Sequence, residues 1–141
     1  MELEGGCVCG VVRFGATGDP LRVMICHCSW CQRRTGSAFG IEVVYCEDQV
    51  AMTGGTVATY RHVSDESGRW LDVAFCSRCG SNLGFTLEAA LGIRTLPAGV
   101  FDDPCQFGPE RQDFRHVYAR SRRDWSDLSD KVEIYEKQFR E

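Results

Sequence analysis

Hydrophobic and polar residues alternate over short stretches of this chain, and glycine-rich turns separate the stretches. Alternation over about four to eight residues, with valine, isoleucine and aromatic side chains, is typical of half-buried β-strands. The pattern predicts strands at residues 11–14, 21–25, 39–45, 56–63, 70–75, 83–87, 93–100 and 114–119. It predicts turns at residues 17–20, 53–55 and 64–68. The chain is therefore predicted to be mainly β.

Helical signals are few and short. One helical turn is predicted at residues 31–34, a second at residues 88–91, and a charged stretch at residues 125–137 could form a third. The 141 residues contain no linker, repeat or low-complexity tract, and this length is common for one domain. We expect a single zinc-binding domain over residues 1–141.

Composition narrows the classes of protein to which the chain could belong. A net charge of -4 gives no basic surface for nucleic acid, so we expect no nucleic-acid partner. No apolar run reaches the roughly 18 residues of a membrane span, and the first residues do not resemble a secretion signal, so we expect no membrane partner either. Nine cysteines in such a chain indicate metal binding or catalysis in a reducing compartment, and we expect a cytoplasmic protein.

Seven of the nine cysteines fall into three tight groups. The groups are Cys7 and Cys9; Cys26, Cys28 and Cys31; and Cys76 and Cys79. In the last group a C-x-x-C pair is followed by Gly80, which suits a tight turn that brings both sulfurs to one ion. This spacing predicts zinc. A redox pair is the alternative, but such pairs belong to α/β chains.

A structural zinc site needs four ligands, so the Cys76 and Cys79 pair needs a second pair from elsewhere. If Cys7 and Cys9 supply it, the middle group keeps three thiolates and an open fourth position, which is the pattern of a catalytic zinc. If the middle group supplies it, Cys7 and Cys9 are left without a partner. We favour the first division because the middle group has more thiolates than the closed site needs.

Other candidate residues are weighed against roles in packing. Cys46 and Cys105 are expected to be small buried side chains outside the sites. His27 should point away from the ligands on either side of it, and His62 and His116 are expected to pack. Trp30 could wall the open site or lie in the core. Hydrogen-bond donors for an oxygen of the substrate could come from Arg33, Arg34, Thr35 and Ser37.

These residues lie in segments that resemble the family of glutathione-dependent formaldehyde-activating enzymes, which shares its domain with centromere protein V. The resemblance is carried by residues 5–14, 26–39 and 75–83, and residues 99–104, 116–118, 121–122 and Trp125 also fit. Asp124 and the pair Val132 and Glu133 depart from the family pattern, which commonly has proline before Trp125 and Leu-Pro in place of the pair.

The resemblance implies a β-tent of stacked antiparallel sheets and two zinc ions. It implies a structural zinc on the first and last cysteine groups and a catalytic zinc on Cys26, Cys28 and Cys31. The implied activity is that of a carbon–sulfur lyase, S-(hydroxymethyl)glutathione synthase, whose substrates are glutathione and formaldehyde. Two alternatives stay open: a non-enzymatic zinc-binding interaction module, and a related zinc enzyme that detoxifies another aldehyde or an epoxide.

Overall fold

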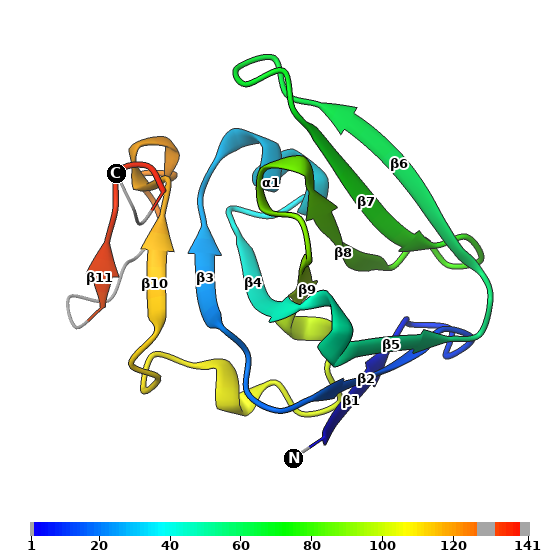
Figure 1. Cartoon of the computed structure of the whole chain (residues 1–141). Helices are drawn as coiled ribbons and strands as arrows, with labels where there is room; N and C mark the ends of the chain where they lie inside the picture. The colour runs from blue at the N-terminus through cyan, green and yellow to red at the C-terminus, as the bar shows by residue number, and fades with distance from the viewer. Residues whose placement is uncertain (1, 127–131, 139–141) are drawn as a thin grey trace.

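The computed structural model describes residues 2–126 and 132–138, and in these ranges it contains two β-sheets and one α-helix. The large sheet has the order β11 (Glu133–Ile134), β10 (Phe114–Val117), β3 (Arg22–Cys26), β4 (Gly40–Cys46), β9 (Ile93–Pro97), β8 (Asn82–Leu87), β7 (Trp70–Cys76) and β6 (Val57–Val63). The small sheet has the order β1 (Glu2–Gly6), β2 (Arg13–Thr17) and β5 (Val50–Thr53). Figure 1 shows the small sheet at one end of the molecule and helix α1 (Ser29–Thr35) toward the other end.

The predicted mainly β fold is confirmed, and all eight predicted strands overlap observed ones. The expected strand at residues 93–100 ends at Pro97 and continues as a 3-10 helix, Ala98–Val100. The helical turn at residues 31–34 is the centre of α1, and the turn at residues 88–91 contains the 3-10 helix Glu88–Ala90. Further short 3-10 helices are Glu47–Gln49, Cys105–Phe107 and Ala119–Ser121.

The prediction of a helix near the carboxyl end is wrong where the structure describes it. Residues 133–134 form β11, which pairs with β10, and residues 124–126 form a turn. Residues 127–131 of that predicted stretch lie outside the described residues.

Most neighbouring strands are antiparallel, as the predicted arrangement of sheets requires. One edge of the large sheet differs, because β10 pairs in parallel with both β3 and β11. The pairing of β10 with β3 places Val117 opposite Cys26, at the end of the strand that leads into the middle cysteine group. A segment distant in sequence thus borders the three-cysteine loop.

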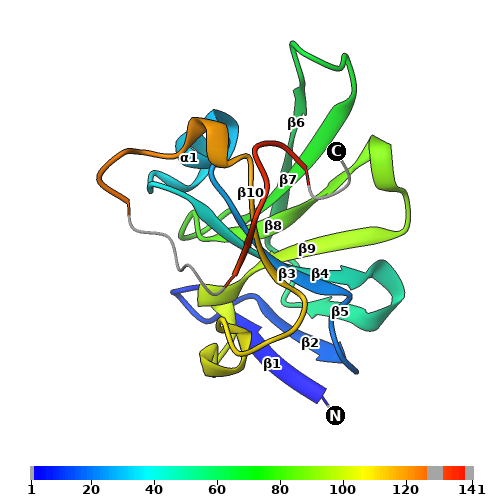
Figure 2. The ribbon, with the colours of Figure 1, turned by 90° about the vertical axis from the view of Figure 1, so that its left-hand side faces the viewer.

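The main hydrophobic core lies where the two sheets meet. Phe101 is central to it, with its ring centre 5.0 Å from that of Phe14 on β2 and 4.7 Å from that of Phe107. Val43 and Tyr45 reach this core from β4 and are fully buried. The turned view in Figure 2 again places β1, β2 and β5 at the far end of the molecule from α1. The core therefore joins the sheets and keeps the first cysteine group distant from α1.

Candidate metal centres

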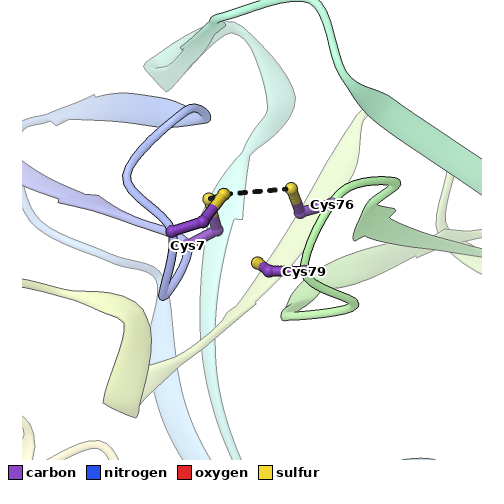
Figure 3. Close-up of side chains that lie close together, drawn as sticks. Cys7, Cys76 and Cys79 are labelled. Carbon is purple, nitrogen blue, oxygen red and sulfur yellow. Dashed lines mark hydrogen bonds between the residues drawn. The ribbon is translucent and has the colours of Figure 1, made fainter.

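The first and last cysteine groups come together between the two sheets. Cys7 and Cys9 lie on the loop that follows β1, Cys76 is the last residue of β7, and Cys79 lies on the loop between β7 and β8. Figure 3 shows Cys7 facing Cys76 and Cys79 across this gap. The four sulfurs lie within 4.8 Å of one another, and we call them the four-cysteine cluster. Cys7 and Cys76 are buried, whereas Cys9 and Cys79 are exposed.

Backbone turns aim the sulfurs of the four-cysteine cluster. The amide of Gly80 donates to the carbonyl of Cys76 at 2.8 Å, and Gly80 has a φ of 77°, which favours glycine. On the other loop the amide of Val12 donates to the Cys7 sulfur at 3.3 Å. Ser81 lies 3.2 Å from the Cys79 sulfur through its hydroxyl, and a hydrogen bond from this hydroxyl is the main cause that lowers the pKa of Cys79 to about 5.

The spacing of these sulfurs fits a tetrahedral zinc ion. A Zn–S distance of about 2.3 Å in a tetrahedron places the sulfurs about 3.8 Å apart. The Cys7 and Cys9 sulfurs are 3.5 Å apart, and those of Cys9 and Cys76 are 3.9 Å apart. Four cysteine sulfurs at tetrahedral spacing are a usual ligand set for zinc, and thiolates favour soft metal ions.

The middle group forms a second cluster at the start of α1. Cys26 ends β3, Cys28 is the N-cap of α1, and Cys31 lies in the first turn of the helix. Their sulfurs lie within 4.8 Å of one another, and among the residues that the structure describes no fourth histidine, cysteine or carboxylate joins them. We call this group the three-cysteine cluster. Cys26 and Cys31 are buried, and Cys28 is partly exposed.

Local hydrogen bonds shape the three-cysteine loop. The amide of Cys31 donates to the Cys28 sulfur at 3.2 Å, which both caps the helix and points that sulfur inward. The side chain of Gln32 donates to the carbonyls of His27 and Ser121, at 2.8 and 2.9 Å. Since Ser121 follows β10, this amide fastens the loop to a distant part of the chain.

Hydrogen bonds among the three thiols of this cluster shift their pKa values in opposite directions. Hydrogen bonds from Cys26 and Cys31 lower the pKa of Cys28 to about 3, while the hydrogen bond to Cys28 is the largest cause that raises the pKa of Cys26 to about 12. Hydrogen bonds with Cys26 and Cys28, followed by burial, raise the pKa of Cys31. The hydrogen bonds thus favour the thiolate at Cys28 over the other two. A divalent cation binds thiolates and would displace the thiol protons.

His27 points away from both sulfurs beside it, as expected. It is fully buried, and its Nε2 lies 3.0 Å from Nδ1 of His116, so the two rings form a buried pair behind the three-cysteine loop. Desolvation lowers the pKa of both imidazoles, to about 4 for His27. His62 packs as predicted, with its ring centre 5.7 Å from that of Trp30. Trp30 itself is half-buried beside the three-cysteine cluster.

The four predicted hydrogen-bond donors differ in their exposure and in their hydrogen bonds. The hydroxyl of Thr35 is occupied by the carbonyl of Cys31 at 2.7 Å, and Arg33 and Ser37 are exposed. Arg34 is not free to meet a substrate, because its side chain is buried in an ion pair with Glu42. Burial alone would lower the pKa of Arg34, but Glu42 and Cys31 outweigh burial and raise it, so the guanidinium stays charged.

Sequence reasoning missed Glu42 entirely. Its position in the apolar stretch 39–45 was the available signal, since a lone carboxylate among buried residues needs a partner. The expected burial of the two remaining cysteines is wrong, because Cys105 is exposed and Cys46 is partly exposed. Cys105 lies in the 3-10 helix Cys105–Phe107 and is exposed there.

Comparison with known proteins assigns the family. The family model for the glutathione-dependent formaldehyde-activating enzyme matches residues 2–120, which include both cysteine clusters. The chain belongs to this family. A relative from Halomonas elongata, named "Putative glutathione-dependent formaldehyde-activating enzyme", is 28% identical over 132 residues, which are 91% of this chain and 82% of the relative.

A solved structure supports the fold of this family member. The crystal structure of a Rhodobacter sphaeroides protein superposes with a TM-score of 0.58 at 18% sequence identity, and the match covers 77% of this chain and 93% of that one. At this identity the likeness concerns the fold alone. Within residues 2–126 and 132–138, no helix is long and apolar enough to cross a membrane.

Proposed function

We propose that this chain binds two zinc ions and is a cytoplasmic, zinc-dependent carbon–sulfur lyase of the S-(hydroxymethyl)glutathione synthase type. The observation that carries the proposal is the three-cysteine cluster, in which three sulfurs converge and the described residues supply no fourth ligand. Catalytic zinc sites commonly have three protein ligands and one position for substrate. Membership of the family supports glutathione and formaldehyde as the substrates.

The two clusters have different roles in this proposal. The four-cysteine cluster provides a complete ligand set and joins the two sheets, as expected of a structural zinc site. The three-cysteine cluster, Cys26, Cys28 and Cys31, is a separate group at the end of β3 and the start of α1. We assign catalysis to that second cluster.

The reaction joins a thiol to an aldehyde. The sulfur of glutathione forms a bond to the formaldehyde carbon, the carbonyl π electrons move to oxygen, and the thiol proton ends on the new hydroxyl; the reverse breaks the carbon–sulfur bond. A zinc ion held by three thiolates supplies a Lewis acid that favours sulfur ligands and stabilises a thiolate at neutral pH.

Residues around the three-cysteine cluster would bind and orient the substrates. Trp30 and Tyr118 pack against the cluster and provide apolar walls that limit the access of water. Arg33 and Ser37 are exposed on the segment that follows the cluster, so they remain available as donors to polar groups of a thiol substrate. Arg34 is buried in its ion pair with Glu42, and the hydroxyl of Thr35 already donates to the carbonyl of Cys31, so neither is assigned this role.

The direct test is to mix the purified chain with glutathione and ¹³C-labelled formaldehyde and to measure the formation of the adduct by NMR exchange. The exchange rate should exceed that of the protein-free mixture. If the rates are the same with metal-loaded protein, the lyase assignment fails. Exchange with another aldehyde or with an epoxide, but not with formaldehyde, would favour the related detoxifying enzyme.

A pair of variants tests the division of the cysteines. Cys28→Ala should lose one zinc ion and the activity while the chain keeps its fold, because the three cysteines lie on one short loop that the hydrogen bonds of Gln32 also hold. Cys79→Ala should lose the other zinc ion and unfold much of the protein, because structural zinc contributes directly to folding. Cys105→Ala is the matched control and should change neither. Equal damage from Cys28→Ala and Cys79→Ala would contradict the division.

A further inference from the structure

A buried ion pair lies against the three-cysteine cluster. Nη2 of Arg34, in the last turn of α1, donates to Oε1 of Glu42 on β4, and the two side chains are only 5% and 2% exposed. The same Nη2 also lies 3.8 Å from the sulfur of Cys31 and donates to it. One guanidinium nitrogen thus contacts both a carboxylate and a sulfur of the cluster.

The surroundings hold this guanidinium in place. Its central carbon lies 5.1 Å from the ring centre of Trp30 and 4.9 Å from that of Phe85, and such contacts stabilise a desolvated cation. Gly40 leaves room for the pair, since a Cβ at this position would overlap Oε1 of Glu42 and lie 3.1 Å from Nη2 of Arg34. Helix, strand and aromatic rings all fix the position of Arg34.

Stability does not account for the pair. Desolvation of two charges offsets their attraction, and replacement of a buried pair by apolar residues is often neutral or stabilising. Nε and Nη1 of Arg34 and Oε2 of Glu42 are buried without a hydrogen-bond partner in the described part of the chain, which adds a further cost. The contact with Cys31 therefore provides the reason for placing a cation here.

We propose that Arg34 is a positioning residue that withdraws charge from the Cys31 sulfur, and that Glu42 sets the strength of this effect. The inference rests on metal binding by the three-cysteine cluster in the proposed function. Three thiolates on a divalent ion leave a net charge of -1, which disfavours a further anionic ligand. A cationic donor on one sulfur offsets part of that charge, so the cluster accepts a substrate thiolate more readily.

Glu42 makes the proposal testable in two directions. With both partners present, the pair is close to neutral and the field of Arg34 at the sulfur is moderated. Loss of both partners removes the hydrogen bond to Cys31, whereas loss of the carboxylate alone leaves the guanidinium charge uncompensated. The two changes should therefore alter the charge on sulfur with opposite signs. A role in packing alone would give no such reversal.

The experiment loads the full-length chain with Co(II) and measures the thiolate-to-metal charge-transfer bands together with metal affinity. The spectrum of Cys28→Ala, which reports the four-cysteine cluster alone, is subtracted. In Arg34→Met/Glu42→Leu, the bands should move to longer wavelength, and metal should bind the three-cysteine cluster about 10- to 100-fold more weakly, as is common when a hydrogen bond to a metal ligand is lost. In Glu42→Gln, the bands should move to shorter wavelength.

Matched variants separate this effect from a general one. Arg34→Lys should move the bands less than the double variant does, because it keeps a cation near the sulfur of Cys31. Arg111→Met breaks the ion pair with Asp113, which lies outside both clusters, and should leave the bands unchanged. Unchanged bands and affinity in Arg34→Met/Glu42→Leu, or shifts of the same sign in that variant and in Glu42→Gln, would overturn the inference alone. No Co(II) binding by the wild-type three-cysteine cluster would overturn the proposed function as well.

Discussion

Replacement of Gly84 by alanine tests how closely two strands of the large sheet pack. Gly84 lies on β8 with a φ of 87°, in the left-handed region, which costs a residue with a Cβ about 1–2 kcal/mol. A Cβ there would overlap the carbonyl oxygen of Thr95 on β9 and lie 3.1 Å from the Cα of Leu96. Relieving such an overlap with backbone adds about 1–3 kcal/mol. We expect Gly84→Ala to lower the free energy of unfolding by about 2–5 kcal/mol.

Gly92→Ala is the matched control for this change. Gly92 has a similar φ of 81°, but a Cβ at Gly92 would meet no atom within 4 Å. It should therefore carry the backbone cost alone, about 1–2 kcal/mol. The gain from a less flexible unfolded chain is the same in both variants and cancels in the comparison. The difference between the variants isolates the contact with Thr95.

The assay is urea unfolding of each variant, with zinc content measured beforehand so that metal loss is not counted as strain. For a slope of about 2 kcal/mol per molar urea, the midpoint of Gly84→Ala should lie about 0.5–1.5 M below that of Gly92→Ala. Equal midpoints would refute the reasoning, because the close approach of β8 to β9 would then carry no energetic cost.

Three further predictions concern the core, the buried histidines and the spare cysteines. Leu83 is fully buried beside Cys7 and Cys76, so Leu83→Ala should cost about 3 kcal/mol and lower Tm by about 6–12 °C in calorimetry. Burial lowers the pKa of His116, so the native state binds fewer protons than the unfolded state. Stability should therefore fall as the pH drops below about 6.5, and His116→Gln should flatten this slope in urea titrations; an unchanged slope would contradict the assignment. Brief alkylation of metal-loaded protein should modify Cys105 first in peptide mass spectra, whereas early modification of the metal-ligand cysteines would contradict metal protection.

Local sequence pattern predicted most strands but not their partners. Alternation over residues 70–75 identifies β7 because its signal is contained within the strand itself. The strand β1, with the sequence ELEGG, carries two glycines and escaped prediction. It forms because Gly5 lets the backbone lie against the ring of Phe14, a contact that only the folded chain creates. The parallel pairing of β10 with β3 likewise depends on distant segments and leaves no local signal.

The candidate sites show the same division between local and distant information. Cysteine spacing predicted which sulfurs lie together on each tight loop, but the approach of Cys7 and Cys9 to Cys76 and Cys79 depends on contact between distant loops. Sequence spacing could not reveal the ion pair between Arg34 and Glu42, since that contact exists only when α1 packs against β4. Two adjacent arginines looked equivalent in sequence, yet Arg33 faces solvent and Arg34 lies in the interior.

The positions of the cysteines along the chain also determine which cluster is completed first during synthesis. Cys26, Cys28 and Cys31 emerge from the ribosome almost together, so a nascent chain can present all three sulfurs before most strands exist. The other cluster must join Cys9 to Cys76 across 67 positions, and closing such a loop costs about 4 kcal/mol of chain entropy. It can be completed only after β7 has been synthesised. In the proposed function, zinc would therefore be captured between the sheets only late in the biogenesis of this protein.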